Sequence, residues 1–304
     1  MPRRSALLTA NLGMLVVALL WGAQVPVVNQ LAERWDPFFL ALVRYVMALP
    51  VLWLLLRIVE PGTSWLPEGV ILRLFGLGLG TSGFAVFYMF GVAWSNPVTA
   101  ALILACSPVI NGLVAWIAEG ARPSRGLLAG LLLVVPGGVV ATVDWQRSAT
   151  EFDVTGGEPM ILLAIVCWAW YSLMAPRWLP RCSQLRITAL SVVATLPILS
   201  VVYGLAWMAG MTYAPSGRPA GADLLLFIYL AVGVLVVAVT LWHRGVAALG
   251  LGVASMYLNL IPVVAIAVAM ALGVMPRTGQ VVGGLLVLAG LVVAQVIDRR
   301  GSVN

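Results

Sequence analysis

The amino-acid sequence predicts an all-α polytopic membrane protein, with ten transmembrane helices that form two inverted five-helix repeats around a central cavity. Three observations lead to this prediction. Hydrophobic residues make up 62% of the 304 residues and charged residues only 9%, whereas about a quarter of the residues in a soluble domain are charged. Apolar segments long enough to cross about 30 Å of hydrocarbon recur from one end of the chain to the other. The second half of the chain also resembles the first.

The helices follow from the apolar segments, which are separated by short polar connections. The length of these segments, and their lack of apolar-polar alternation, favour helices over a β-barrel. The first segment follows the basic stretch MPRRS and is too long for a signal peptide, so we expect it to remain in the protein. The predicted spans, in order, are 9–31, 37–57, 70–91, 96–117, 125–143, 158–177, 186–209, 222–243, 247–271 and 278–297.

The repeat becomes visible when the chain is compared with itself. Trp21 aligns with Trp168 at one offset, and Pro108 aligns with Pro262 at a slightly larger one. Because each copy has five helices, an odd number, the second copy must enter the membrane in the opposite direction. Inverted repeats are typical of secondary transporters, which place the substrate between the halves near the middle of the membrane. The two predicted domains are residues 1–150 and 151–304.

The distribution of arginine predicts the orientation of the chain. If the N-terminus is cytoplasmic, twelve arginines lie in cytoplasmic segments and four on the other side, and such an excess is typical of the cytoplasmic side. We therefore expect a multi-pass protein of the plasma membrane, the cell inner membrane in a bacterium, with both termini in the cytoplasm. The first set is Arg3, Arg4, Arg57, Arg73, Arg122, Arg125, Arg177, Arg181, Arg186, Arg244, Arg299 and Arg300; the second is Arg34, Arg147, Arg218 and Arg277.

The net charge of +6 reports this topology and does not indicate a nucleic acid partner, because the arginines are scattered over many connections. The expected partners are a small-molecule substrate and the lipid bilayer. Glycines four residues apart, at Gly126 and Gly130 and again at Gly279 and Gly283, predict close packing of the fifth and tenth helices. A homodimer interface is the alternative use of these glycines.

Several motifs carry a resemblance to a known family. The pair WG at Trp21 and Pro26 lie in the first helix, the sequence SPV begins at Ser107 in the fourth, and WIAEGARPSRGLLAG leads into a glycine-rich fifth helix. With the five-plus-five repeat, these motifs resemble the EamA-type ten-helix exporters of the drug/metabolite transporter superfamily, most of all its aromatic amino acid exporters. The resemblance covers nearly the whole chain and implies export of small metabolites.

The first helix contains polar residues that suit one wall of an aqueous cavity. Trp21 and Gln24 lie on one stripe of this helix because residues three apart share a face. Their partners in the second copy are Trp168 and Tyr171, so these four residues are candidates for substrate binding.

Pro26, on the adjoining stripe, frees a backbone carbonyl, which is tolerated only beside protein or water. It is therefore a candidate hinge. The alternative is that Gln24 and Asn29 only join helices through hydrogen bonds.

The fourth and ninth helices carry matching polar and proline positions. Ser107 and Pro108 lie in the fourth, and Tyr257, Asn259 and Pro262 lie in the ninth. An amide near the centre of the membrane is costly without a partner, so these polar residues are candidates for the binding site. The two prolines are candidate hinges for alternating access. Ordinary helix packing is the alternative for both groups.

Arg44 is an isolated charge inside the second predicted helix, and its partner in the second copy is the neutral Ser191. An arginine at a helix centre costs roughly 2.5 to 3.5 kcal/mol on insertion scales, so something should compensate it. It can hold a substrate carboxylate in a bidentate pair. Alternatively, it extends to the outer surface, towards Glu33 or Asp36.

Three further aromatic residues, Tyr88, Trp94 and Trp242, fall inside predicted spans or near their ends. Such rings can stack on an apolar or planar substrate. Tyr88 and Trp242 also align between the two copies. We include all three among the candidate substrate-binding residues, with a role in the core as the alternative.

The sequence offers no catalytic or metal-binding motif. It has no lysine and no acidic residue in the middle of a predicted span, and Cys106, Cys167 and Cys182 show neither metal-ligand spacing nor a disulfide framework. We therefore expect no enzyme activity, no cofactor and no metal. Because proton-driven carriers usually hold a titratable group at depth, facilitated diffusion or exchange is favoured. A proton site on His243 is the alternative.

These features predict a secondary transporter that moves small amphipathic metabolites out of the cell by alternating access. Aromatic or large neutral amino acids are the expected substrates, from the family resemblance, the inward-lying rings and Arg44. Two alternatives stay open. One is an exporter with broad specificity for metabolites or drugs, and the other is a non-selective pore, although no ring of like charges or carbonyl filter is visible.

The predicted topology can be tested by thiol labelling. A cysteine introduced at Ser5 or Ser302, in a variant whose native cysteines are replaced by serine, should stay unlabelled when intact cells meet an impermeant thiol reagent. Both positions should react after the membrane is permeabilised. Labelling of one end alone in intact cells would contradict an even number of spans.

Overall fold

The chain folds into a bundle of helices. The structure, a computed structural model, describes residues 2–61, 69–120, 124–142, 156–212, 221–249 and 257–301, so the predicted domain boundary at 150 lies outside the described residues. The first half contains α1 (Pro2–Ala32), α2 (Pro37–Val59), α3 (Ile71–Ala93), α4 (Pro97–Ala105), α5 (Ser107–Glu119) and α6 (Arg125–Thr142). The second contains α7 (Glu158–Trp178), α8 (Gln184–Met208), α9 (Ala222–Ile228), η1 (Tyr229–Ala238), α10 (Val239–Leu249), α12 (Ile261–Ala271) and α13 (Thr278–Gly301).

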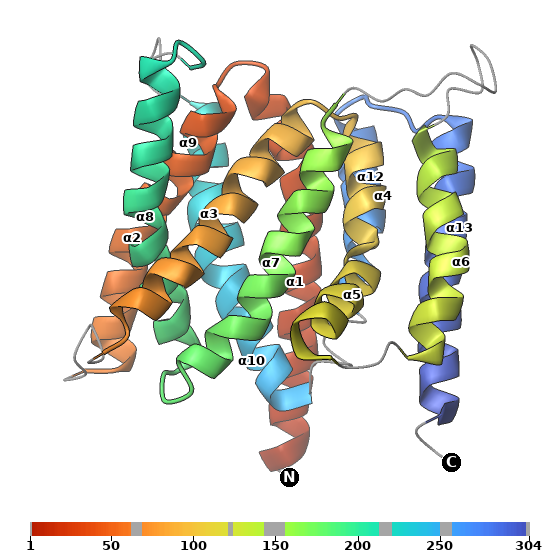
Figure 1. Ribbon diagram of the computed structural model, residues 1–304, viewed down its shortest axis with the longest axis horizontal. Coiled ribbons are helices and arrows are strands. Elements are labelled where there is room, and N and C mark those ends of the chain that lie inside the picture. The colour runs from red at the N-terminus through yellow and green to blue at the C-terminus, as the bar shows by residue number, and fades with distance from the viewer. Residues whose placement is uncertain are drawn as a thin grey trace.

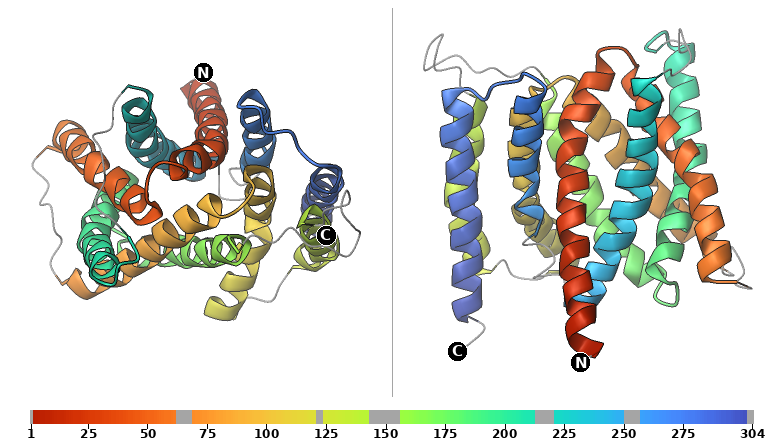
Figure 2. Two further views of the ribbon diagram at one scale, coloured as in Figure 1. Left: turned by 90° about the horizontal axis from the view of Figure 1, so that it is seen from above. Right: turned by 180° about the vertical axis from the view of Figure 1, so that it is seen from behind.

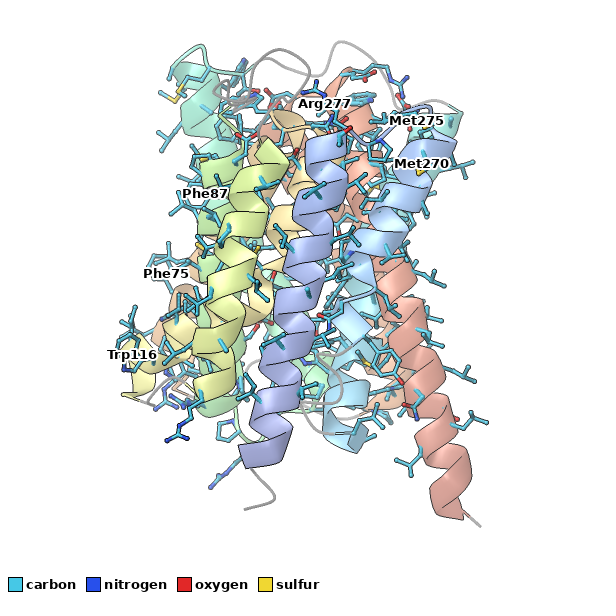
Figure 3. All side chains as sticks on the ribbon, turned by 90° about the vertical axis from the view of Figure 1, so that its right-hand side faces the viewer. Phe75, Phe87, Trp116, Met270, Met275 and Arg277 are labelled. Carbon is cyan, nitrogen blue, oxygen red and sulfur yellow. The ribbon has the colours of Figure 1, made fainter. Side chains whose placement is uncertain are left out.

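The predicted all-α membrane fold is confirmed. Within the described residues, six helical segments are long and apolar enough to cross a membrane, and α4 with α5 form a seventh as a bent pair. The remaining predicted spans correspond to shorter apolar helices in α6, α12 and α13. The outer surface suits lipid, since Phe75, Trp116 and Met270 are 53%, 45% and 43% exposed and point away from the bundle (Figure 3).

The two halves run in opposite directions through the bundle. α1 begins and α13 ends at the same end of the molecule, whereas α7 begins at the opposite end (Figure 1). Packing between the halves follows a reciprocal pattern. α3 packs against α7 and α8, and its counterpart, the segment formed by η1 and α10, packs against α1 and α2. The repeat partners Trp21 and Trp168 meet edge to face, with ring centroids 6.1 Å apart.

The fifth helices of the two halves, α6 and α13, lie side by side at one edge of the bundle (Figure 2). Glycine allows this approach. A Cβ added at Gly137 would lie 2.8 Å from the carbonyl oxygen of Gly283, and one at Gly130 would lie 2.9 Å from the Cβ of Ala294. Gly130 and Gly283, predicted to form a packing face, therefore allow the backbones of α6 and α13 in the same chain to approach closely.

Three segments depart from a continuous α-helix. α4 and α5 meet at Cys106 with a bend of 47°, η1 is a π-helix, and residues 259–260 form a turn between the helical residues 257–258 and α12. α10 continues to Leu249, past the predicted start of the ninth span at 247, and residues 250–256 of that span lie outside the described residues. Local sequence could not place this boundary, since the apolar residues are continuous across it.

The packing of α6 against α13 gives a matched pair of variants. Gly137→Ala should lower the midpoint of thermal unfolding, because its Cβ meets backbone atoms of α13 and overpacking costs about 1–3 kcal/mol. Gly138→Ala, the control, adds a Cβ with nothing within 4 Å, so its midpoint should stay the same or rise. Equal midpoints for the two purified variants in detergent would contradict the close contact.

Candidate functional site

A cavity of about 140 Å³ lies at mid-depth between the two halves. Because one water needs about 10–15 Å³ by this measure, the space holds on the order of ten waters or one small ligand. Helices from both halves contribute to its wall. The described lining residues are Trp21, Gln24, Arg44, Tyr45, Phe84, Tyr88, Leu104, Ala105, Ser107, Asn111, Ile165, Trp168, Val234, Leu235, Val239, Leu258, Asn259 and Ile261.

Arg44 is the one charged residue among these lining residues. It lies two turns into α2 and is 3% exposed. Its guanidinium carbon lies 5.2 Å from the ring centroid of Tyr45, and 5.9 Å from those of Phe84 and Tyr88. The alternative in which Arg44 extends to the outer surface is therefore wrong. The side chain is directed into the cavity, within a group of aromatic rings.

The guanidinium of Arg44 has unused hydrogen-bond donors. Its Nε and Nη2 atoms are both buried without a hydrogen-bond partner, and within the described part of the chain no carboxylate lies within ion-pair distance of it. Burying the charge is costly, and contact with the rings compensates part of that cost. A desolvated cation–π contact contributes about 2 kcal/mol. Nε and Nη2 form one edge of the planar fork that binds a carboxylate through two parallel hydrogen bonds.

Aromatic rings form a large part of the wall. Trp168 lies next to Trp21 and also contacts Phe84, with centroids 5.0 Å apart. Phe84 stacks on Tyr88 at 5.4 Å. The indole nitrogen of Trp21 donates a hydrogen bond of 3.3 Å to the carbonyl oxygen of Val234 in η1, which fixes the ring against the irregular part of the second half. The site thus combines one cation with several rigid apolar faces.

The two amides predicted in the first helix have different surroundings. Gln24 is buried, lines the cavity and interacts with the side chain of Tyr88. Asn29 instead donates hydrogen bonds to the carbonyl oxygens of Val92 (3.0 Å) and Ser95 (3.1 Å). The packing alternative therefore holds for Asn29, which fastens α1 to the end of α3, whereas Gln24 faces the cavity.

The opposite wall carries uncharged polar groups. Ser107 and Asn259 line the cavity as predicted, and Asn111 lines it as well. The hydroxyl of Ser107 donates a hydrogen bond to the carbonyl oxygen of Leu104 in the preceding turn. The side-chain oxygen of Asn111 is buried without a partner. This wall is formed where α4 gives way to α5 and by the turn before α12.

Four predicted binding residues lie outside the cavity wall. Trp94 ends α3, is 49% exposed and packs on Phe90. Trp242 lies behind Trp21, with ring centroids 5.6 Å apart. The other two are held by hydrogen bonds: the hydroxyl of Tyr171 lies 3.1 Å from Ser191 Oγ, and that of Tyr257 lies 2.5 Å from Asn11 Oδ1. Helical spacing placed them on the right helices, but it could not tell a lining ring from one packed behind it.

The predicted hinge prolines lie at two kinds of position. Pro108 and Pro262 occupy the first turns of α5 and α12, directly after the breaks in the fourth and ninth spans. Proline suits a first helical turn because it lacks the N–H that would be unpaired there. Pro26 lies inside α1, which is helical on both sides of it.

Three lining residues with chemical character were not among the predicted binding residues: Tyr45, Phe84 and Asn111, the last of which the sequence does place on the polar stripe of Ser107. A signal existed for each. Phe84 lies one turn before Tyr88, and Asn111 lies one turn after Ser107, so each shares a face with a predicted residue. Tyr45 follows Arg44 directly and reaches the cavity from the neighbouring face of α2.

One end of the bundle is joined by a charged contact between the halves. Arg34 Nη2 lies 2.6 Å from Asp223 Oδ1, and the indole nitrogen of Trp35 donates to Asp223 Oδ2 at 2.9 Å. Trp35 also packs on Phe39 and Phe227, with centroids 5.5 and 5.2 Å apart. The turn between α1 and α2 is thereby fastened to the start of α9, towards the upper end of the bundle in Figure 1.

No group of three or more His, Cys, Asp or Glu side chains that could hold a metal ion occurs among the described residues. His243 lies in α10, where its Nε2 atom is buried without a partner. It is absent from the cavity wall in the part of the chain that the structure describes.

A helical bundle that encloses a polar and aromatic cavity between two oppositely directed halves is the architecture of a membrane transporter. The comparison with known families agrees. The EamA-like transporter family matches residues 8–143 and again residues 155–295, so the chain belongs to that family. It is a multi-pass membrane protein.

Individual relatives are distant. The chain is 24% identical to YyaM, an uncharacterised transporter of Bacillus subtilis, over 74% of this chain and 73% of that protein. It is 27% identical to a probable terminal-alkyne amino-acid exporter of Streptantibioticus cattleyicolor, over 73% and 70% of the two chains. A solved crystal structure shares the fold at 21% identity, with a TM-score of 0.65 and coverage of 96% and 98%.

The aromatic wall can be tested with a pair of tryptophans. Trp21→Ala should raise the KM for a transported aromatic substrate roughly five- to tenfold, because an aromatic contact contributes about 0.5–1.5 kcal/mol beyond its buried area. Trp94→Ala, the control, alters a ring outside the cavity and should leave KM unchanged. Uptake by proteoliposomes measures both values. A larger effect at Trp94 than at Trp21 would contradict this assignment of the wall.

Proposed function

We propose that this protein exports small amphipathic amino acids, aromatic or large neutral ones, by alternating access. The observation that carries the proposal is Arg44, which lines the cavity and whose guanidinium has its Nε and Nη2 atoms buried without partners. A fixed cation in a low-dielectric site attracts an anionic group strongly. The substrate carboxylate would supply the missing partner and occupy both donors.

The surroundings of Arg44 support a carboxylate attached to an apolar body. The rings of Trp21, Phe84 and Trp168 offer stacking surfaces beside the cation. The described lining residues include no acidic side chain, so a substrate with a carboxylate balances the charge of the site, whereas a simple amine does not. Gln24 and the tyrosine hydroxyls can accept hydrogen bonds from the amino group of the substrate.

The relatives support the same class of substrate. The protein of Streptantibioticus cattleyicolor is named a probable terminal-alkyne amino-acid exporter, and YyaM is named an uncharacterised transporter. For alternating access, we propose that the breaks at Pro108 and Pro262, together with Pro26, act as hinges about which the halves move. The protein would act in the plasma membrane with both termini in the cytoplasm.

A second candidate is a broad exporter of metabolites or drugs. It is favoured by the wall opposite Arg44, where Leu104, Leu258 and Ile261 are apolar and would accept many ligands. Such a carrier would transport compounds without a carboxylate as readily as amino acids. A test of the carboxylate therefore separates the two functions.

Variants of Arg44 test the proposed carboxylate contact. Arg44→Gln should raise the KM for tryptophan about thirtyfold or more, since loss of one partner of a buried charge pair costs at least about 2 kcal/mol. Arg44→Lys should be intermediate, because lysine keeps the charge and loses the fork. Arg57→Gln, which changes an exposed arginine on the same helix, is the control and should leave KM unchanged.

The measurement is counterflow in proteoliposomes with tryptophan, phenylalanine and threonine, and with tryptamine as the analogue that lacks a carboxylate. Thermal unfolding of Arg44→Gln should occur at the same or a higher temperature, because an uncompensated buried charge is removed. Transport of tryptamine at the rate of tryptophan by the native protein, or an unchanged KM in Arg44→Gln, would reject the carboxylate site and favour the broad exporter.

A further inference from the structure

The cavity contains a second group without a partner, on the wall that faces α2. Several buried polar side chains in the described residues lack a hydrogen-bond partner, and two of them, Arg44 and Asn111, also line the cavity. The unpartnered atoms of Arg44 are donors, Nε and Nη2. The unpartnered atom of Asn111 is an acceptor, the amide oxygen Oδ1.

Nothing else in the wall around Asn111 uses this acceptor. Ser107, one turn earlier on the same face, already donates its hydroxyl to the carbonyl oxygen of Leu104. The lining residues Ala105, Leu258 and Ile261 carry no side-chain donor, and the amide of Asn259 on the same wall does not donate to Asn111 Oδ1. A buried amide oxygen has two lone pairs to satisfy, and leaving it unpaired in an apolar site is unfavourable. It therefore needs a donor that enters from the cavity.

Asn111 and Arg44 lie at different depths in the bundle. α2 and α4 begin at the same end (Figure 1), at Pro37 and Pro97. At 1.5 Å per residue, Arg44 lies roughly 10 Å along α2 from that end, and Asn111 lies roughly 20 Å along the bent pair α4 and α5. Aromatic rings, among them Trp168, line the same cavity. A ligand whose carboxylate is on Arg44 would extend its side chain along these rings towards Asn111.

We propose that Asn111 is a specificity-determining residue of the substrate site. Its amide oxygen accepts a hydrogen bond from an N–H or O–H group at the end of the substrate side chain. The inference rests on the proposed amino-acid function and narrows it to side chains that combine a large ring with a distal donor, such as an indole. Phenylalanine, which has the ring without the donor, would bind less tightly.

The expected selectivity arises because a buried acceptor that loses its hydrogen-bond donor is left unpaired at a cost in binding free energy. An apolar pocket alone discriminates weakly between ligands of similar shape. A site built to hydrogen-bond a substrate N–H or O–H rejects the analogue without it, because its own buried polar group is then left unpaired. Asn111 would give the cavity this kind of selectivity, whereas Arg44 selects for the carboxylate shared by all the amino acids compared.

The experiment compares two ligands of nearly equal shape. Tryptophan and benzothienylalanine, in which sulfur replaces the indole N–H, compete for counterflow of labelled tryptophan in proteoliposomes. The native protein should bind tryptophan about tenfold more tightly, as expected for one buried hydrogen bond. Asn111→Leu, which keeps the branched shape and removes the acceptor, should bring the ratio of the two affinities close to one. Asn111→Asp, which keeps an acceptor oxygen, should retain a preference for the N–H ligand.

A structural role for Asn111 predicts a different outcome. If its amide stabilised the fold, Asn111→Leu would unfold at a lower temperature, whereas removal of an unpaired acceptor leaves the temperature unchanged or raises it. A lower unfolding temperature with an unchanged ligand ratio would overturn the proposal. An unchanged ratio with normal stability would also overturn it, and would mean that water satisfies the amide.

The ratio of the affinities for tryptophan and benzothienylalanine also separates this inference from the proposed function. If both ligands compete equally well in the native protein, and Arg44→Gln weakens both, the carboxylate site stands and the role of Asn111 is rejected. If neither amino acid competes, the proposed function fails first. Trp94→Ala, which alters a ring outside the cavity, is the control and should keep the native ratio of the two affinities.

Discussion

The structure depends on one constraint, that no backbone N–H or C=O can be left unpaired in hydrocarbon. Irregular backbone is tolerated only where it is buried in protein or lines a cavity, and here the departures from α-helix meet at the cavity. The π-helix η1 has its Val234 carbonyl paired with the indole of Trp21. The break before α5 has the Leu104 carbonyl paired with Ser107. The turn before α12 supplies Asn259 to the wall. Breaks in the helices and the candidate site therefore have a common cause.

The two halves share a plan and differ in chemical content. Arg44 has Ser191 as its counterpart, and Gln24 has Tyr171. In the second half these two residues are hydrogen-bonded to each other, with Tyr171 Oη 3.1 Å from Ser191 Oγ, and they lie behind the cavity wall. In the first half the corresponding side chains both line the cavity. In the second copy these polar groups bond to each other, and in the first copy they line the cavity, so most of the polar side chains in the described cavity wall come from the first half.

Much of the candidate site could be predicted from local sequence, because Trp21, Gln24 and Ser107 fall on stripes whose spacing fixes the face they share. The spacing did not reveal whether a side chain lines the cavity, is packed behind its wall or lies on the outer surface. Tyr171 and Trp94 satisfy the same rules, and the first is packed behind the wall while the second lies on the outer surface. Whether a ring lines a cavity depends on the neighbouring helix that covers it, and that helix comes from a distant part of the chain.

A lipid environment, the helices and the internal repeat could be predicted from the linear chain, because they follow from hydropathy, segment length and internal similarity. Arg44 was also identified there, since a charge inside an apolar span has few physical explanations. Contacts in the folded protein were needed to show that Arg44 and Asn111 line the same cavity and that α6 packs on α13. These facts arise from contacts between segments far apart in sequence, whose geometry is set by helix packing and is not encoded in any one stretch of residues.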